Sequence, residues 1–225
     1  MGQCFQEWFA APLKLDLWIG LPAAQYSRVA PIQPYRPQKG DPVSRVARAS
    51  RQIGSVPNLW MFNAGGWTVD SLNQQEGLTP EMPAVNGVGN GRALAALLSV
   101  FNCAAVAEGV GLTEVTTARA TSVAAATQRD VTLCTRTRFS LGFMKSMDNR
   151  DDPAADNFII GESAFGHVGH GGAFGFCDPE AGVSAGYVMN QQGPGILVNQ
   201  RGQRLIDACY QALGYRDVIG GAWRR

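Results

Sequence analysis

Residues suited to metal binding or to acid–base chemistry are scarce in this sequence. Only two histidines and three lysines occur among 225 residues, and the five cysteines are far apart and include no C-x-x-C pair. Such spacing is typical of neither a disulfide framework nor a zinc site. We therefore expect no metal site, and reduced, mostly buried thiols at Cys4, Cys103, Cys134, Cys177 and Cys209.

Blocks of like charge and long apolar runs are also missing. Nineteen basic and 18 acidic residues leave a formal net charge of +1, which favours neither nucleic acid nor an anionic membrane as a partner. No apolar run approaches the roughly 20 residues of a membrane helix, and the N-terminus lacks the pattern of a secretory signal. The chain as given is therefore expected in the cytoplasm, while the location of the complete protein stays open.

What the sequence does contain is enough apolar residues, 45% of the chain, for a packed core. Residues 20–90 are rich in proline and glycine, which predicts loops that wrap over a body. Residues 91–225 predict a helix, antiparallel strands and a C-terminal helix. The fold class is therefore α/β of the α+β type, an antiparallel sheet flanked by helices in one domain over 1–225.

Three helices are predicted before the strands. QCFQEWFAAPL reads as a short amphipathic helix that ends at Pro12. Asn90 is a good N-cap for a helix whose apolar face carries Leu94, Leu97, Leu98 and Phe101. LTEVTTARATSVAAATQ predicts a weaker helix, because threonine has low helix propensity.

The strands follow from residue 130 onward. DVTLCTRTRFSLGF alternates between an apolar face, with Val131, Leu133, Phe139, Leu141 and Phe143, and a face with Arg136 and Arg138. FGHVGHGGAFGFCDPE and GVSAGYVMN predict two more strands, joined at DPEAG as a hairpin. GQRLIDACYQALG then predicts a helix with Leu205, Ile206, Cys209 and Leu213 on one stripe and an end at Gly214.

Both histidines, His167 and His170, lie in the glycine-rich stretch 165–180. Positions three apart on a strand point to opposite faces, which argues against a shared metal. Glycines in a strand let a ligand lie against the backbone, and a nearby histidine suits proton transfer near neutral pH. In the simpler interpretation, the glycines allow close packing of the sheet and His167 is a surface residue. The pattern alone favours this interpretation.

A resemblance changes that balance. FGHVGHGGAFGFCDPEAGVSAGYVMN, followed by RGQRLIDACYQALGYR, resembles the C-terminal end of serine β-lactamase-related proteins, which include class C-like β-lactamases, D,D-peptidases and esterases. FAAPLKLDLWIGLP, PAVNGVGNGRALAALLSVF and TRTRFSLGFM are similar to other segments of that family in the same order. The resemblance implies acyl transfer to a serine and hydrolysis of a small ester or amide in the complete enzyme, without a metal or organic cofactor.

The resemblance also implies roles for three residues. His167, Val168 and Gly169 match the third motif of the family in its His-x-Gly form. By this analogy His167 assists proton transfer or holds the substrate, and Gly169 is the glycine of the motif. The backbone N–H of His170 then forms one arm of an oxyanion hole.

The other two motifs of the family are absent. No serine lies three residues before Lys14, Lys39 or Lys145, and no tyrosine is followed two positions later by asparagine. In the family both motifs precede the segment that FAAPLKLD resembles, so the sequence is interpreted as the C-terminal part of a longer hydrolase. We expect it to be inactive or very weak alone, and to associate with itself or with an N-terminal complement.

Two alternatives stay open. Gly182 to Gly186 reads G-x-S-x-G, which makes Ser184 a rival esterase nucleophile, although that motif needs a strand, a sharp turn and a helix. A non-catalytic pseudoenzyme or interaction module is the other. Trp60, Phe62 and Trp67 are interpreted as core or loop anchors with some support for a pocket wall, and Asp178 and Glu180 as turn residues without a catalytic role.

Overall fold

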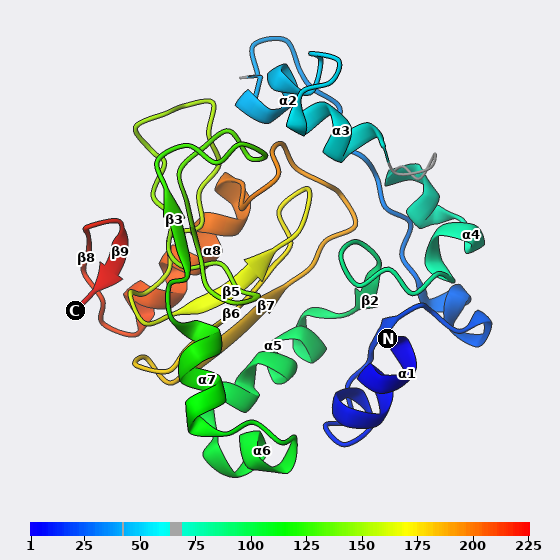
Figure 1. Cartoon of the computed structure of the whole chain (residues 1–225), viewed down its shortest axis with the longest axis vertical. Coiled ribbons are helices and arrows are strands. Elements are labelled where there is room, and N and C mark those ends of the chain that lie inside the picture. Colours follow the sequence, from blue (N-terminus) through cyan, green and yellow to red (C-terminus); the bar gives the residue numbers. More distant parts are fainter. Residues whose placement is uncertain (42, 64–68) are drawn as a thin grey trace.

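A three-stranded antiparallel sheet lies at the centre of the computed structural model, which describes residues 1–41, 43–63 and 69–225. Its strands are β5 (Phe165–Val168), β6 (Phe174–Asp178) and β7 (Val183–Tyr187). They follow one another as two hairpins, with His167 opposite Gly175 and Phe176 opposite Ala185 (Figure 1). The hairpin predicted at DPEAG is confirmed as the β6–β7 connection.

The stretch predicted as one strand, 165–180, is a hairpin of its own. The chain reverses between β5 and β6 at Gly171 and Gly172, whose φ angles of 83° and 107° lie in the left-handed region. The Gly169 N–H donates to the Ala173 carbonyl at 2.7 Å and closes the turn. The turn therefore carries His170 at the end of β5.

The strand predicted over 130–143 is much shorter, because Asp130 builds a turn at its start. The Asp130 carboxylate accepts hydrogen bonds from the backbone N–H groups of Thr132 and Leu133, both at 2.8 Å. Cys134 follows with a φ of 56°, which no strand residue adopts. Only β4 (Thr137–Phe139) is extended, so Val131 is 73% exposed.

Met144 joins this strand to the central sheet. It bridges Phe139 on one side and Gly166 on the other, so that β3 (Ala125–Thr127) and β4 extend the sheet beyond β5. The segment predicted as a weaker helix contains α7 (Glu114–Thr121), with Thr113 as its N-cap, before the chain enters β3. The predicted mixture of helices and an antiparallel sheet is confirmed.

Helix α5 (Gly91–Ser99) covers one face of β6 and β7. The Asn90 side chain accepts a hydrogen bond from the Ala93 N–H at 2.9 Å, which confirms the predicted N-cap. A Cβ atom on Gly186 would lie 2.3 Å from the Gly91 carbonyl oxygen. The absence of a side chain at Gly186 therefore lets the helix lie directly on the strand.

Helix α8 (Gln200–Ala212) packs on the opposite face of the sheet. Its buried stripe is centred on Ile206 and Tyr210, which pack with Phe174 and Phe176 in the main core. The predicted stripe is partly wrong, because Leu205 is 49% exposed. Leu213 lies beyond the last residue of the helix and is also exposed, while Gly214 has the predicted left-handed φ, 83°.

A hairpin that the sequence did not predict follows α8. Strands β8 (Asp217–Ile219) and β9 (Ala222–Arg224) pair with each other, and Trp223 stacks on the buried Tyr210 ring with centroids 5.9 Å apart. The C-terminal residues therefore close the core around α8.

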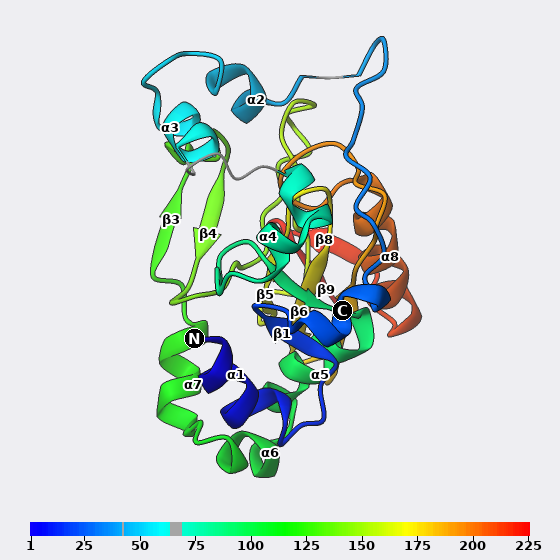
Figure 2. The same cartoon turned by 90° about the vertical axis from the view of Figure 1, so that its right-hand side faces the viewer.

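The rest of the chain forms short elements around this body (Figures 1 and 2). The predicted N-terminal helix is α1 (Gly2–Phe5), continued as a wider π-helical turn over Gln6–Ala10. Strand β1 (Leu17–Ile19) pairs with β2 (Gly87–Gly89). The remaining helices are α2 (Arg45–Ala49), α3 (Val56–Phe62), α4 (Gln75–Leu78) and α6 (Ala104–Gly109), with 3₁₀ turns at Ala23–Arg28, Val69–Asn73 and Val100–Asn102.

Candidate active site

His167 lies on the sheet face that α5 covers. It alternates with Gly166 and shares its face with Phe165, whose ring contacts that of Phe101 at a centroid distance of 5.1 Å just after α5. Its partner across the ladder is Gly175, whose missing Cβ leaves room for Leu94 and Leu98. Phe165 is buried but His167 is exposed, so the imidazole stands at the open end of this face.

The backbone of β5 determines the tautomer of His167. Its Nδ1 atom lies 2.8 Å from the carbonyl oxygen of Val168. Because a carbonyl oxygen only accepts, the hydrogen of the neutral ring is on Nδ1. Nε2 then carries the lone pair and is the atom able to take a proton.

His170 lies in the turn after β5, three residues further along the chain. Within the described ranges no acceptor is hydrogen-bonded to its backbone N–H, whereas Gly169 and Gly172 on either side both donate within the turn. Its ring Nδ1 is 3.5 Å from Nε2 of Gln192, at the long limit of a hydrogen bond. The backbone N–H of His170 is therefore available to a ligand.

The surroundings of His170 favour the neutral form of its ring. Desolvation by surrounding atoms lowers the pKa of His170 below 6.5, and the nearby charge of Asp156 opposes this shift. Because the residue remains exposed to solvent, the effect of this shift on folding is limited. Burial in turn raises the pKa of Asp156, whose carboxylate accepts from the Ile196 N–H at 2.7 Å. Asp156 belongs to no motif of the sequence, so the sequence alone does not reveal its part in this site.

The turn is held in place by the segment that precedes α8. The Asn199 side chain donates to the Gly171 carbonyl at 2.9 Å, and the Gly193 N–H donates to the same oxygen at 2.9 Å. A Cβ atom on Gly172 would lie 2.2 Å from the Asn199 amide nitrogen. Asn199 is also the N-cap of α8, so the helix start and the turn are coupled through one side chain.

Lys145 is a buried cation on the same face as His167. Its ammonium group donates to the Ser163 carbonyl at 3.0 Å and lies 5.7 Å from the centre of the Phe165 ring. Burial lowers the pKa of Lys145, and the charge of Arg138 acts in the same direction. From the sequence this lysine was notable only because no serine lies three residues before it, as Ser-x-x-Lys would require.

Ser184, the rival nucleophile, lies within β7, which continues to Tyr187 without the turn that a nucleophile elbow needs. Its hydroxyl accepts a hydrogen bond from the Asn102 amide at 2.9 Å, and Asn102 in turn accepts from the Cys177 thiol at 3.2 Å. Burial raises the pKa of Cys177 to about 11. Within the described ranges, neither the Ser184 hydroxyl nor the Cys177 thiol is hydrogen-bonded to a basic group.

Asp178 is buried, where the sequence predicted an ordinary turn residue. It does organise the turn after β6, because it accepts from the Glu180 and Ala181 N–H groups, both at 3.1 Å. It also accepts hydrogen bonds from Ser163 at 2.8 Å and from Tyr210 at 2.7 Å. Its role is to join the sheet to α8.

The predicted aromatic pocket wall receives no support from Trp60 and Phe62, which are both exposed on α3. Trp67 lies outside the described residues. A cavity of about 510 Å³ occurs elsewhere, between β4 and the β8–β9 hairpin, and is not lined by His167, Gly169 or His170.

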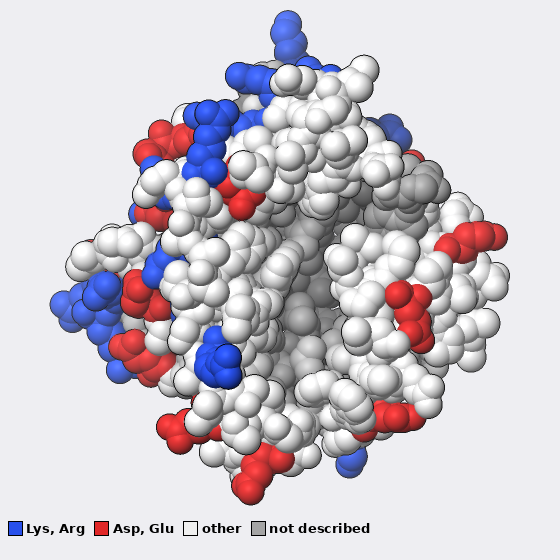
Figure 3. Space-filling view, viewed as in Figure 1, with Lys and Arg blue, Asp and Glu red and all other residues white. Residues whose placement is uncertain are grey.

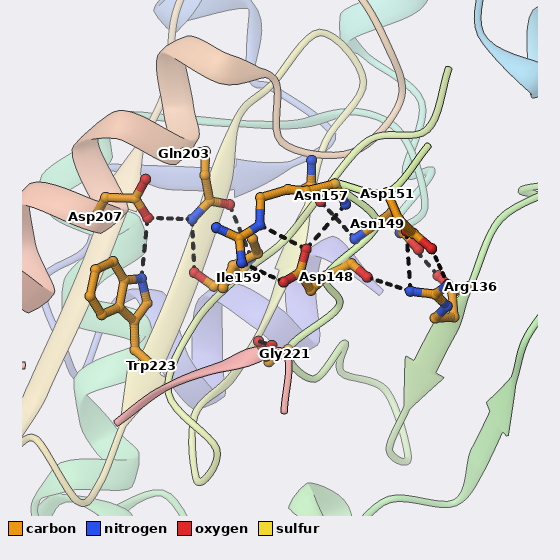
Figure 4. Close-up of polar contacts among 12 residues, drawn as sticks. Arg136, Asp148, Asn149, Asp151, Asn157, Ile159, Gln203, Asp207, Gly221 and Trp223 are labelled. Carbon is orange, nitrogen blue, oxygen red and sulfur yellow. Dashed lines mark hydrogen bonds and ion pairs between the residues drawn. The ribbon is translucent and has the colours of Figure 1, made fainter. Parts of the chain in front are cut away.

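The arginines of that cavity are already paired with carboxylates. Figure 4 shows Arg136 between the Asp151 carboxylate, at 2.7 Å, and the Asp148 carbonyl, at 2.9 Å. Arg150 binds the Asp148 carboxylate through two nitrogens, at 2.9 and 2.6 Å. This network links the loop after β4 to the body and leaves little free positive charge for a ligand.

The fold is thus an antiparallel sheet with helices on both faces, in which β5 and the turn after it carry the His-x-Gly sequence. The sequence matches the family described as Beta-lactamase over residues 1–208. The chain therefore belongs to the beta-lactamase family.

Solved structures agree with this assignment. The chain is 30% identical to a penicillin-binding protein homologue from Caulobacter crescentus, with a TM-score of 0.67 over 94% of this chain and 52% of that one. It is 30% identical to a family VIII carboxylesterase, with a TM-score of 0.69 over 93% of this chain and 51% of that one. EstA from Arthrobacter nitroguajacolicus Rue61a shares the fold at 22% identity, with a TM-score of 0.67 over 95% and 54%.

The chain thus spans about half the length of the solved structures that it matches. No curated protein matches it. Among the helices that the structure describes, none has the length and apolar character needed to cross a bilayer.

Proposed function

We propose that this chain supplies the His-x-Gly half of a serine hydrolase site that cleaves small esters or amides through an acyl-serine. The proposal rests on one observation, the arrangement of β5 and its turn. His167 Nε2 is left free to exchange a proton, and the His170 N–H is free to donate. These are the two groups that an acyl transfer site needs beside the nucleophile.

The roles of these groups follow from their chemistry. His167 takes or returns the proton of the attacking or leaving oxygen, and the His170 N–H stabilises the negative charge that develops on the carbonyl oxygen. Gly169 is in the site because its backbone must be approached closely. A Cβ atom there would meet only Ala173, at 3.5 Å, so packing alone does not require glycine.

The nucleophile has to come from outside this half, because neither Ser-x-x-Lys nor Tyr-x-Asn occurs in the sequence. Without it there is no covalent step, and a histidine with one N–H donor gives only weak hydrolysis of reactive esters. The chain alone is accordingly expected to be inactive or very weak.

The first part of the test uses the purified chain alone. It measures hydrolysis of a short p-nitrophenyl ester, and fluorophosphonate labelling with mass mapping identifies any reactive serine. The expected result is no stoichiometric label and turnover close to that of free imidazole. Turnover that Ser184→Ala abolishes, with a label on Ser184, would overturn the proposal in favour of the G-x-S-x-G alternative.

The second part supplies the missing half. The portion of the family VIII carboxylesterase that this chain does not match is produced together with the chain. The proposal expects labelling of a serine in the added portion and hydrolysis that His167→Asn lowers. A complex that forms and labels but hydrolyses equally well with His167→Asn would contradict the role of His167.

A further inference from the structure

Positive charge is concentrated in one short segment although the whole chain is nearly neutral. Residues 36–51 contain five basic residues and a single carboxylate, Asp41. That carboxylate is engaged locally, by the Tyr35 hydroxyl and by the Gln38 N–H at 2.6 Å. Arg48 and Arg51 are exposed, and neither has an ion-pair partner in the part of the chain that the structure describes.

The basic segment leads into a helical hairpin made of α2 and α3. Ser55, the N-cap of α3, donates to the Ala49 carbonyl at 2.8 Å, and Asn58 donates to the Ser50 carbonyl at 2.7 Å. Asn58 also accepts from the Gly54 N–H at 3.1 Å. These bonds hold the connection between the two helices, residues 50–55, in one conformation.

Among the described residues, the hairpin is attached to the body through α2. The Arg45 N–H donates to the Ala154 carbonyl at 3.3 Å, and the Arg45 guanidinium forms an ion pair with Asp152. Val46 is buried and lines a small pocket together with Leu133 and Leu197 of the body. Figures 1 and 2 both place α2 and α3 at the end of the molecule opposite α6.

The hairpin exposes large apolar side chains on α3 and on the connection before it. Ile53, at the tip between the helices, is 93% exposed, and Phe62 is 68% exposed. Leu59 and Trp60 of α3 are each 52% exposed. In Figure 3 lysine and arginine side chains gather at the end of the molecule where α2 lies.

We propose that the α2–α3 hairpin binds the surface of an anionic phospholipid bilayer. Ile53 at the tip and the exposed apolar side chains of α3 enter the region between headgroups and acyl chains, while Arg48 and Arg51 interact with lipid phosphates. Nucleic acid is a poorer fit, because a base stacks on aromatic rings and gains nothing from Ile53 or Leu59. The proposal does not depend on the hydrolase proposal.

Sedimentation of the purified chain with vesicles of phosphatidylglycerol and phosphatidylcholine tests this, beside vesicles of phosphatidylcholine alone. We expect binding to the anionic vesicles that weakens as salt is added. Trp60 reports insertion, because its emission should shift to shorter wavelength on binding. The Trp60→Phe variant should still bind the vesicles but should lose the emission shift that comes from Trp60.

Two paired variants separate charge from apolar contact. Arg48→Gln combined with Arg51→Gln should weaken binding roughly 20- to 30-fold, from the attraction of two basic residues to the surface. Ile53→Ser combined with Phe62→Ser should weaken it at least about tenfold. All four side chains are exposed, so the fold is retained.

Matched controls carry the same changes elsewhere on the surface. They are Arg119→Gln with Arg216→Gln, and Val115→Ser with Ile219→Ser, all at exposed positions. These variants should bind as the unchanged chain does.

Four results would overturn the proposal: no binding to anionic vesicles at low salt, equal binding to neutral vesicles, equal loss in the control variants, or binding to a random oligonucleotide but not to vesicles. Self-association that Ile53→Ser with Phe62→Ser abolishes, without vesicle binding, would instead identify a second copy of the chain as the occupant.

Discussion

The Nδ1 atom of His167 lies 2.8 Å from the carbonyl oxygen of Val168, the next residue in β5. The strand that presents the imidazole thus also selects its tautomer. In many proteins a separate carboxylate or carbonyl orients a functional histidine. Here the residue that follows the histidine supplies that acceptor, so the orientation needs no second element of the fold.

The tautomer of His167 is a direct prediction. Nitrogen-15 NMR of the neutral ring should show hydrogen on Nδ1, because the Val168 oxygen only accepts. The chain has only two histidines, so the His170→Gln variant leaves a single ring and makes the assignment unambiguous. A ring protonated at Nε2 in that variant would contradict the geometry described here.

His170 should titrate below the ordinary histidine pKa of 6.5, because desolvation by surrounding atoms lowers its pKa and the Asp156 charge only partly offsets this. The unfolded chain then binds the proton more readily. His170 therefore contributes stability that is fully present above pH 6.5 and is lost as pH falls through its folded pKa.

Proton NMR over that pH range measures the His170 titration, and denaturant unfolding of the chain and of His170→Gln measures its contribution. Asp156→Asn should lower the pKa of His170 further, since an opposing charge is removed. An unchanged titration in Asp156→Asn would show that the carboxylate does not act on this ring.

Local signals in the sequence were sufficient where one side chain determines an element. Asn90 predicts the start of α5 because its side chain caps the helix, and the structure has that bond. The alternation over 130–143 predicted one long strand, which was wrong, because Asp130 binds the following N–H groups and Cys134 takes a left-handed φ. A local turn of this kind overrides the preference for a strand that alternating apolar residues indicate, and the pattern of apolar residues does not reveal the turn.

The candidate site was predictable only in part, for the same reason. His167, Gly169 and His170 are contiguous, so a motif could reveal them. Asp156 and Asn199, which act on His170 and its turn, come from loops distant in sequence and meet the turn only after folding. The β8–β9 hairpin was missed because its strands are three residues long.

Thiol chemistry should divide the cysteines by burial. At pH 8 a small thiol reagent should modify Cys4 and Cys103, which are exposed, well before Cys177, which is buried and whose pKa is raised to about 11. Mass mapping of a time course makes the measurement, with the unfolded chain as the reference in which all five react. Early modification of Cys177 in the folded chain would contradict its place behind α5.

Tyr210 should be a strong stabilising residue. Its hydroxyl donates to the buried Asp178 carboxylate at 2.7 Å and accepts from the Gly161 N–H at 2.7 Å. Tyr210→Phe leaves both groups short of a partner and should lower the free energy of unfolding by about 1–3 kcal/mol. Tyr187→Phe is the control, because no described residue is hydrogen-bonded to the Tyr187 hydroxyl, and it should cost little. An equal loss of unfolding free energy in the two variants would contradict the stabilising role of the Tyr210 hydroxyl.

Gly186 tests whether the glycines of the sheet serve packing rather than ligand binding. A Cβ atom there would lie 2.3 Å from the Gly91 carbonyl oxygen and 2.7 Å from the Ala95 nitrogen, both backbone atoms of α5. Gly186→Ala must therefore push the helix off the strand and should cost about 1–3 kcal/mol in denaturant unfolding.

Gly109 is the matched control for that change. It lies in α6, its φ is not positive, and a Cβ atom there meets nothing within 4 Å. Gly109→Ala should be neutral or should raise stability by up to about 1 kcal/mol, since alanine favours the helix. If Gly186→Ala proves as harmless as Gly109→Ala, α5 does not rest on β7 as described. A clear loss at Gly186 alone would assign this glycine to the contact between helix and sheet.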